Sequence, residues 1–120
     1  MNAVVVEDSK VIRRMIMQIL SQLDIEVIGE AENGIEGLEL IMAKKPDLVT
    51  LDVNMPKLSG EDVIRWIKKS KLTPKICIIS SVDDEEKKHL LELGADGVID
   101  KPVTLQKMVR FSYESGLKSI

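Results

Sequence analysis

The sequence predicts an α/β fold in which a parallel β-sheet lies between two layers of helices. Short apolar runs, typical of strands buried on both faces, alternate five times with segments whose apolar residues recur at helical spacing. The connections are short and hold the glycine, proline and asparagine residues that favour turns. This alternation is typical of a three-layer sandwich, and we expect a single domain over residues 1–120.

Each predicted strand is short and ends at a polar residue or a turn signal. Valine, isoleucine and leucine dominate four of the five runs, whereas Gly29 interrupts the second and weakens it. The predicted strands cover residues 3–6, 26–30, 48–52, 76–80 and 98–100.

Capping residues, glycines and prolines delimit the predicted helices. The first helix begins beside Asp8 and Ser9 as possible caps and carries an apolar stripe from Val11 to Leu23. The second helix is expected from Gly34 to before Pro46, and the third from Gly60 to before Pro74. The fourth begins near Asp83 or Asp84 and stops at Gly94, and the fifth runs from about Leu105 to about Leu117.

Four single residues have ordinary structural interpretations. Cys77 lies inside a predicted strand and is expected to be a buried thiol. Met15 and Trp66 are assigned to the core or to a partly covered face, and His89 to a solvated, charged helix.

The composition excludes several classes of protein. With 44% hydrophobic and 31% charged residues, the chain resembles soluble globular proteins. A net charge of −3 argues against direct nucleic-acid binding, which needs a clustered basic face. The amino terminus lacks a secretory leader pattern, and no apolar stretch approaches the ~18 residues that allow membrane insertion. With its single cysteine, the chain is predicted to be cytoplasmic.

Polar residues end or directly follow four predicted strands at the edge where open α/β sheets bind ligands. They are Glu7 and Asp8, Asp52, Ser80 and Lys101. Three carboxylates at one edge repel one another, which predicts a bound cation, and Mg²⁺ prefers such oxygen ligands. A carboxylate can also attack phosphorus, while an ammonium and a divalent ion offset the charge of phosphoryl oxygens.

Six short motifs occur in one order along the chain. They are Val-Val-Glu-Asp8 with Arg13-Arg14, Asp47-Leu-Val-Thr-Leu-Asp52, Met55-Pro56 with Gly60, Ser80, Gly94-Ala95-Asp96-Gly97 and Lys101-Pro102. In this order and spacing the chain resembles response regulator receiver domains along its whole length, most of all the stand-alone chemotaxis type. The resemblance implies the flavodoxin-like (βα)5 sandwich, with a five-stranded parallel sheet of order 2-1-3-4-5.

The resemblance also implies how a phosphoryl group is handled. Asp52 would accept it as an aspartyl phosphate, Lys101 would pair with its oxygens, and Ser80 would donate its hydroxyl to one of them. The peptide bond between Lys101 and Pro102 is expected to be cis, as in that family.

A magnesium site is implied next to the phosphoacceptor. Asp8 and Asp52 would bind Mg²⁺ directly, the carbonyl of Asn54 would complete the ligands from the protein, and Glu7 would act mostly through a coordinated water. Glu7 stands where aspartate is frequent in that family, and its longer side chain is expected to reach the ion through water.

Two valines are expected to modulate the switch. In receiver domains the residue two positions after the hydroxyl flanks the path of the hydrolytic water; here it is Val82, which offers no polar group. Val98 stands where chemotaxis members usually carry an aromatic that swings inward. Val98 is therefore expected to influence the output face, without the usual aromatic coupling.

The expected function is a phosphoacceptor switch in a two-component system. A sensor histidine kinase would phosphorylate Asp52, and the change of conformation would alter affinity for a target such as the flagellar motor or another effector. The chain would catalyse its own phosphorylation and hydrolysis but turn over no external substrate, and it is expected to be a monomer. The alternative left open is the receiver part of a larger regulator with a DNA-binding or methylesterase output domain.

Two rival classes fit the sequence less well. Phosphatases and dehalogenases with an aspartyl nucleophile usually carry a second carboxylate two residues later, where this chain has Asn54, and a cap domain. Flavodoxin-like electron carriers usually place aromatics against the flavin, whereas aromatic residues make up only 2% of this chain.

Overall fold

Five parallel strands form one sheet in the order β2-β1-β3-β4-β5, which confirms the expected topology. The computed structural model describes residues 1–118. The strands are β1 (Asn2–Val6), β2 (Glu26–Ala31), β3 (Leu48–Leu51), β4 (Lys75–Ser80) and β5 (Gly97–Asp100), and the helices are α1 (Lys10–Gln22), α2 (Gly34–Lys44), α3 (Gly60–Lys69), α4 (Asp84–Leu93) and α5 (Leu105–Glu114).

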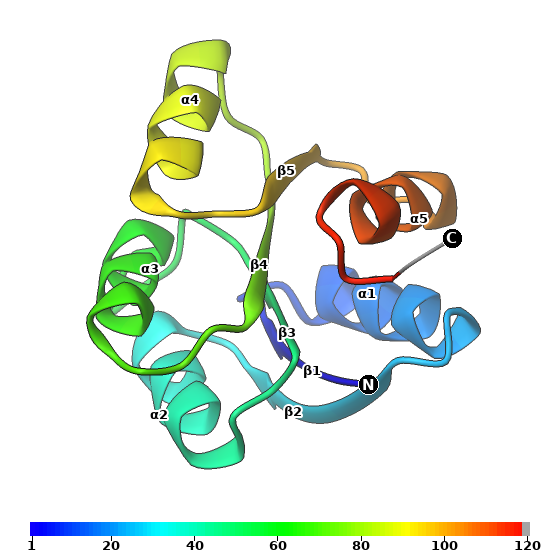
Figure 1. Cartoon of the computed structure of the whole chain (residues 1–120), viewed down its shortest axis with the longest axis horizontal. Helices are drawn as coiled ribbons and strands as arrows, with labels where there is room; N and C mark the ends of the chain where they lie inside the picture. The colour runs from blue at the N-terminus through cyan, green and yellow to red at the C-terminus, as the bar shows by residue number, and fades with distance from the viewer. Residues whose placement is uncertain (119–120) are drawn as a thin grey trace.

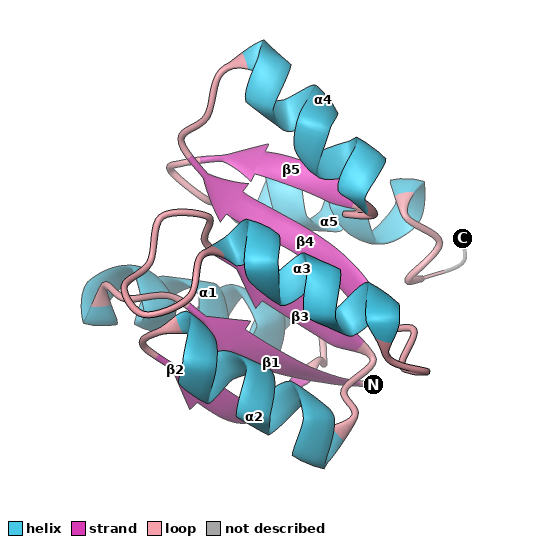
Figure 2. Cartoon of the chain, turned by 90° about the vertical axis from the view of Figure 1, so that its left-hand side faces the viewer, coloured by secondary structure: helices cyan, strands magenta, loops and turns pink. Residues whose placement is uncertain are grey.

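Helices cover both faces of the sheet. Figure 1 shows α1 and α5 on one side and α2, α3 and α4 on the other, and Figure 2 shows the strands between the two layers. Because side chains alternate along a strand, β1 contributes to two cores. Ala3 and Val5 pack with residues of α1 and α5, whereas Val4 and Val6 pack with residues of α2, α3 and α4.

The order of the strands fixes where a ligand site can form. From β1 the chain passes through α1 to β2 on one side, and from β2 it returns through α2 to β3 on the other side of β1. The connections diverge above the carboxyl ends of β1 and β3, the place where open α/β sheets bind their ligands. Glu7, Asp8 and Asp52 follow these two strands.

Each helix has a polar N-cap whose side chain accepts a hydrogen bond from the N–H three residues later. Ser9 caps α1 and Asp83 caps α4, which decides between the candidates in the sequence. The other caps are Asn33, Ser59 and Thr104.

The last helix is shorter than its pattern indicated. It ends at Glu114 instead of Leu117. Gly116 adopts a φ of 80°, in the left-handed region, so the chain leaves the helical path before the apolar Leu117.

The predicted apolar stripes were too wide. Val11 is 71% exposed, Met15 41% and Trp66 54%, so Met15 and Trp66 lie on the partly covered face that the sequence allowed and not in the core. Trp66 lies outside the face of α3 that Val63 and Ile67 bury, and the ammonium of Lys69 lies 5.8 Å from its ring centroid. Cys77 is buried and His89 is exposed, as expected.

Among residues 1–118, no helix combines the length and the apolar character needed to cross a bilayer.

Candidate functional site

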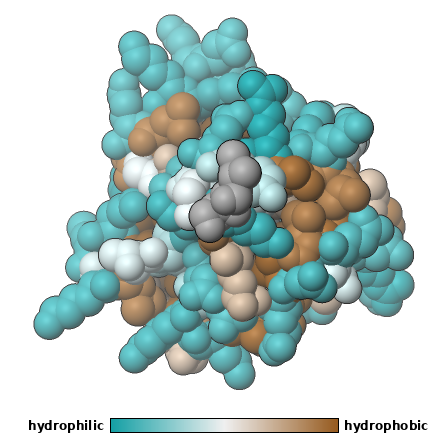
Figure 3. Space-filling model, turned by 45° about the vertical axis from the view of Figure 1, so that its right-hand side comes forward, coloured by the Kyte–Doolittle hydropathy of each residue, from teal (hydrophilic) through white to brown (hydrophobic). Residues whose placement is uncertain are grey.

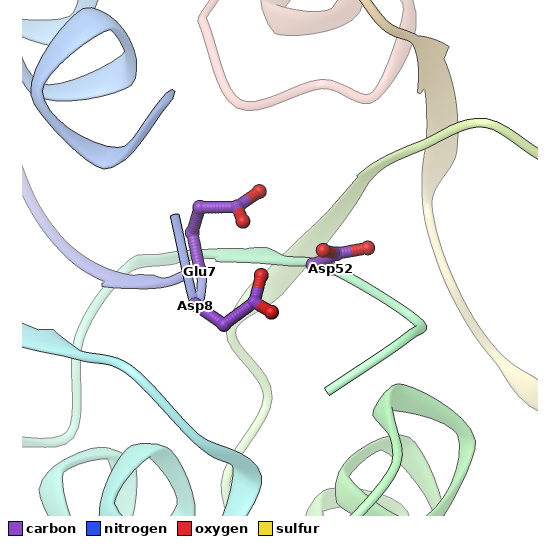
Figure 4. A group of neighbouring side chains, drawn as sticks. All are labelled: Glu7, Asp8 and Asp52. Carbon is purple, nitrogen blue, oxygen red and sulfur yellow. The ribbon is translucent and has the colours of Figure 1, made fainter. Parts of the chain in front are cut away.

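Three carboxylates meet above the carboxyl ends of β1 and β3. Glu7 and Asp8 follow β1, and Asp52 follows β3; Figure 4 shows their carboxylates turned toward one shared space. One oxygen from each lies within 4.8 Å of the others. The structure thus brings together the three acidic residues that the sequence predicted at this edge.

Glu7 is almost completely buried, with an exposed fraction of 1%. Its Oε2 accepts a hydrogen bond from the N–H of Ser9 at 3.0 Å, and its Oε1 lies 3.1 Å from Nζ of Lys101. Burial raises the pKa of Glu7 above its ordinary value. The hydrogen bond from Ser9 and the nearby ammonium of Lys101 lower the pKa, but interactions with Asp8 and Asp52 raise it further.

Asp52 receives a hydroxyl, an ammonium and a backbone N–H on its two carboxylate oxygens. The hydroxyl of Ser80 donates to Oδ1 at 2.9 Å, and the N–H of Asn54 donates to the same atom at 3.3 Å. Nζ of Lys101 donates to Oδ2 at 3.2 Å. Asp52 is only 4% exposed, so these groups act on it in a largely desolvated position.

The backbone around Asp52 holds the carboxylate at the edge of the sheet. Its N–H donates to the carbonyl of Val6 at 3.1 Å, which continues the pairing of β3 with β1 beyond the end of the strand. A Cβ at Gly60 would lie 2.6 Å from the carbonyl oxygen of Asp52, so the start of α3 can approach this closely only with glycine there.

Lys101 links Glu7 and Asp52 through its single ammonium. Burial by itself lowers the pKa of Lys101, but the ion pairs with Glu7 and Asp52 outweigh it, so the pKa lies above its ordinary value. Lys101 is therefore charged at neutral pH. The peptide bond between Lys101 and Pro102 is cis, as the resemblance implied.

The donor set fits a hard divalent cation. Three carboxylates face one ammonium, and they offer only oxygen ligands, which Mg²⁺ prefers. Although Lys101 lies close, Oε1 of Glu7 is a buried atom to which no group among residues 1–118 donates a well-directed hydrogen bond. Asp8 is exposed, which leaves the site open to an ion and its waters.

The remaining predicted residues lie at the margins of this site. The N–H of Asn54 contacts Asp52, and its exposed side chain leaves the role of its carbonyl a prediction. Val82 is half-buried and packs against the hydrophobic core on the face of the sheet that α2, α3 and α4 cover. Val98, also half-buried, lines a hollow of about 300 Å³ between β5 and α5 together with Arg110 and Phe111. The expected roles of both valines stay predictions.

An apolar hollow adjoins the site on the side of α1. It has a volume of about 370 Å³, and its lining residues are Ile12, Met15, Lys101, Pro102 and Val103. Apolar side chains are visible on the side of the molecule that α1 and α5 form (Figure 3). In α1, Val11 and Met15 are exposed. Lys101 borders both this hollow and the carboxylates.

Arg13 is the residue near the site that the sequence did not single out for a role. Its side chain is mostly buried and donates to the carbonyl oxygen of Glu7 at 2.8 Å. The apolar pattern of α1 gave no sign of this, because it placed Arg13 on the polar side of the helix.

Comparison with known proteins connects this geometry to one family. The model of the response regulator receiver domain matches residues 3–111. The signal receiver domain of NarL from Mycobacterium tuberculosis superposes with a TM-score of 0.85 and 32% identity, over 91% of this chain and 90% of that chain. A chain of the CheX–CheY–BeF3–Mg²⁺ complex from Borrelia burgdorferi superposes with a TM-score of 0.91 and 26% identity, over 98% of this chain and 90% of that chain.

Curated relatives include longer proteins. The chain is 42% identical over 100 residues to protein-glutamate methylesterase/protein-glutamine glutaminase 3 of Geobacter sulfurreducens, which covers 82% of this chain and 27% of that protein. It is 38% identical over 112 residues to the corresponding protein of Clostridium acetobutylicum, covering 88% and 32%. The chain thus spans less than a third of the length of these relatives.

Relief of the repulsion among the three carboxylates should make Mg²⁺ stabilise the fold. At a concentration about ten times its Kd, Mg²⁺ should raise the free energy of unfolding by about 1.4 kcal/mol through linkage. Asp8→Ala should remove most of that gain, because Asp8 is the exposed member of the acidic group. Chemical denaturation with and without Mg²⁺ measures both quantities. An equal gain in the parent and in Asp8→Ala would contradict the metal site.

Proposed function

The chain belongs to the response regulator receiver family, and on this basis we propose that Asp52 is the phosphoacceptor of a two-component signalling switch. The observation that carries the proposal is the pairing of the Ser80 hydroxyl and the Lys101 ammonium with the two oxygens of one buried carboxylate. The neighbouring Glu7 and Asp8 supply oxygen ligands for a cation at the same place. Receiver domains are phosphorylated by histidine kinases, and the proposed donor is a sensor kinase.

The transfer uses Asp52 as nucleophile. One carboxylate oxygen forms a bond to phosphorus as the phosphorus–nitrogen bond of a phosphohistidine breaks, and the electron pair of that bond passes to the imidazole nitrogen, which takes up a proton. The hydroxyl of Ser80 and the ammonium of Lys101, which now bond to Asp52, are placed to bond to the phosphoryl oxygens instead.

The acidic group completes the site. Asp8, Asp52 and the carbonyl of Asn54, with Glu7 through a water, are the proposed ligands of Mg²⁺, which supplies positive charge beside the phosphoryl oxygens when bound. The chain therefore promotes its own phosphorylation and hydrolysis and transforms no external substrate. A cytoplasmic location, where kinases draw on ATP, belongs to the same proposal.

The switch follows from the change of partner of Ser80. When its hydroxyl turns from Asp52 to a phosphoryl oxygen, the end of β4 and the loop leading to α4 gain a new constraint, which shifts the population of two conformations. Val98 is too small to follow this movement as an aromatic would. We infer that the response passes through the backbone of the face formed by α4, β5 and α5.

The output is proposed from the curated relatives. Those with 36–42% identity are protein-glutamate methylesterases of which this chain spans less than a third. This favours a receiver that regulates a methylesterase over one that regulates a DNA-binding domain. The stand-alone chemotaxis switch, acting on the flagellar motor or another effector as a monomer, is the second candidate, favoured by the likeness to the CheX–CheY complex. The size of the native protein, read by immunoblot, distinguishes the two.

A small phosphodonor tests the phosphoacceptor directly. Phosphoramidate with Mg²⁺ should add one phosphoryl group to the parent chain and none to Asp52→Asn, because the amide is a far weaker nucleophile than the carboxylate. Intact-mass spectrometry reports the result, and Asp47→Asn, a change at the opposite end of β3, serves as the control. Equal phosphorylation of parent and Asp52→Asn would defeat the assignment.

The apolar hollow beside Lys101 is the proposed contact for the kinase, because it is an exposed apolar surface that borders the site. Met15→Gln should slow transfer from a phosphorylated histidine kinase about tenfold, as the loss of one central apolar contact does at interfaces, and leave the rate with phosphoramidate unchanged. Trp66→Gln, an exposed apolar residue in the opposite layer, is the matched control. Equal slowing of Met15→Gln with both donors would contradict a docking role.

The lifetime of the aspartyl phosphate should respond to Val82. A polar side chain there changes the access of water to phosphorus, so Val82→Glu should alter the decay rate severalfold while phosphorylation is retained. Val98→Tyr, on the side of the hollow between β5 and α5, should leave decay unchanged and shift amide signals of α4. Decay followed by mass spectrometry checks both variants. A severalfold effect of Val98→Tyr with none from Val82→Glu would refute this division.

A further inference from the structure

Arg13 connects two parts of the molecule that meet at the acidic site. Its Nη1 donates to the carbonyl oxygen of Glu7 at 2.8 Å, and its Nε donates to Oε1 of Glu30, in β2, at 2.8 Å. The side chain of Arg13 is only 11% exposed, whereas that of Glu30 is 47% exposed. Buried arginines are rare unless they are paired, and these two contacts are what allows Arg13 to be buried.

The contact fixes the peptide unit from which Asp8 projects. The N–H of Glu7 donates to the carbonyl of Ala31 at 3.0 Å, so Glu7 is held by β2 on its amino side. On its carboxyl side the same residue is held by Arg13. The carbonyl that Arg13 holds belongs to the peptide between Glu7 and Asp8, so its orientation sets the direction of the exposed Asp8 side chain.

Charge alone does not explain an arginine at this place. A cation beside three carboxylates opposes the binding of a divalent ion, so Arg13 would weaken the site if its charge were its only effect. The pairing with Glu30 offsets that charge and leaves the guanidinium free to act through its fixed geometry, since its two donors point to two acceptors at once.

We propose that Arg13 is a positioning residue for cation binding, which holds the Glu7–Asp8 corner while Glu30 holds Arg13. The inference rests on the proposed function, because the cation is the one that assists phosphorylation of Asp52. Neither Arg13 nor Glu30 touches the reacting atoms. They act through the backbone of Glu7.

Calorimetric titration with Mg²⁺ separates this role from a role of charge. Arg13→Met removes a positive charge, so an effect of charge alone predicts tighter binding of Mg²⁺. Loss of positioning predicts the opposite, a Kd for Mg²⁺ about tenfold higher, as when other residues that orient metal ligands are changed. Arg13→Lys keeps the charge but cannot bond to both acceptors, and should also weaken binding. Arg14→Met, an exposed neighbour with the same charge, should leave Kd unchanged or lower it.

Glu30 provides the second arm of the experiment. Glu30→Gln keeps an oxygen that accepts from Nε of Arg13 and should bind Mg²⁺ like the parent, whereas Glu30→Ala loses the acceptor and should bind severalfold more weakly. Charge alone predicts the same loss for both. Because the side chain of Glu30 is half exposed, these variants remain folded even if a change of the buried Arg13 disturbs the core.

A readout without metal completes the test. In the free protein, Arg13→Met and Glu30→Ala should shift the amide signals of Asp8 and Ser9, whereas Arg14→Met should not. Mg²⁺ binding to Arg13→Met and Glu30→Ala with the Kd of the parent would overturn the positioning role and leave the proposed function standing. A parent chain that neither binds Mg²⁺ nor accepts a phosphoryl group would overturn the proposed function, and the role of Arg13 with it.

Discussion

The close approach of three carboxylates at one edge of the sheet is the constraint on which the site depends. Glu7 and Asp52 are buried, so their charges are poorly solvated. For Glu7, this loss of solvation raises the pKa. One ammonium, that of Lys101, lies between them. Three carboxylates thus share one positive charge, and a divalent ion at this place would offset the remaining negative charge. The ion would in turn prepare the site for a phosphoryl group.

The fold maintains this crowding through contacts that do not involve the carboxylates themselves. The backbone of Asp52 pairs with Val6, the backbone of Glu7 pairs with Ala31 and Arg13, and the absence of a side chain at Gly60 lets α3 begin against Asp52. The rest of the sheet is apolar on both faces and packs against helices, so it gives these backbone positions little freedom. The packed sheet thus holds close together three carboxylates that repel one another.

Signalling requires that part of this frame respond to phosphorylation. The groups that contact Asp52 come from different elements: Ser80 ends β4 and Lys101 follows β5. Under the proposed function, exchange of their bonds from the carboxylate to a phosphoryl group would therefore act on the β4–β5 end of the sheet, which α4 covers on one face and α5 on the other. The apolar hollow next to Lys101 lies on the other side of that lysine, toward α1. Lys101 thus borders both the carboxylates and an exposed apolar hollow.

The sequence by itself determined the alternation of strands and helices, the single parallel sheet and the residues at its functional edge. These follow from local patterns, since apolar runs, caps and turns depend on neighbours in the chain, and carboxyl ends of parallel strands share one edge. The motifs around Asp52 and Lys101 then pointed to the receiver family, which the comparison confirmed.

Only the tertiary structure decided which side chains meet. The burial of Arg13 and the exposure of Met15 and Trp66 depend on how far each helix turns its face toward the sheet, which the apolar stripe does not specify. The bonds of Arg13 to Glu7 and Glu30, and those of Lys101 to Glu7 and Asp52, join residues of different elements at fixed distances. Such contacts arise from packing in three dimensions, and no spacing along the chain encodes them.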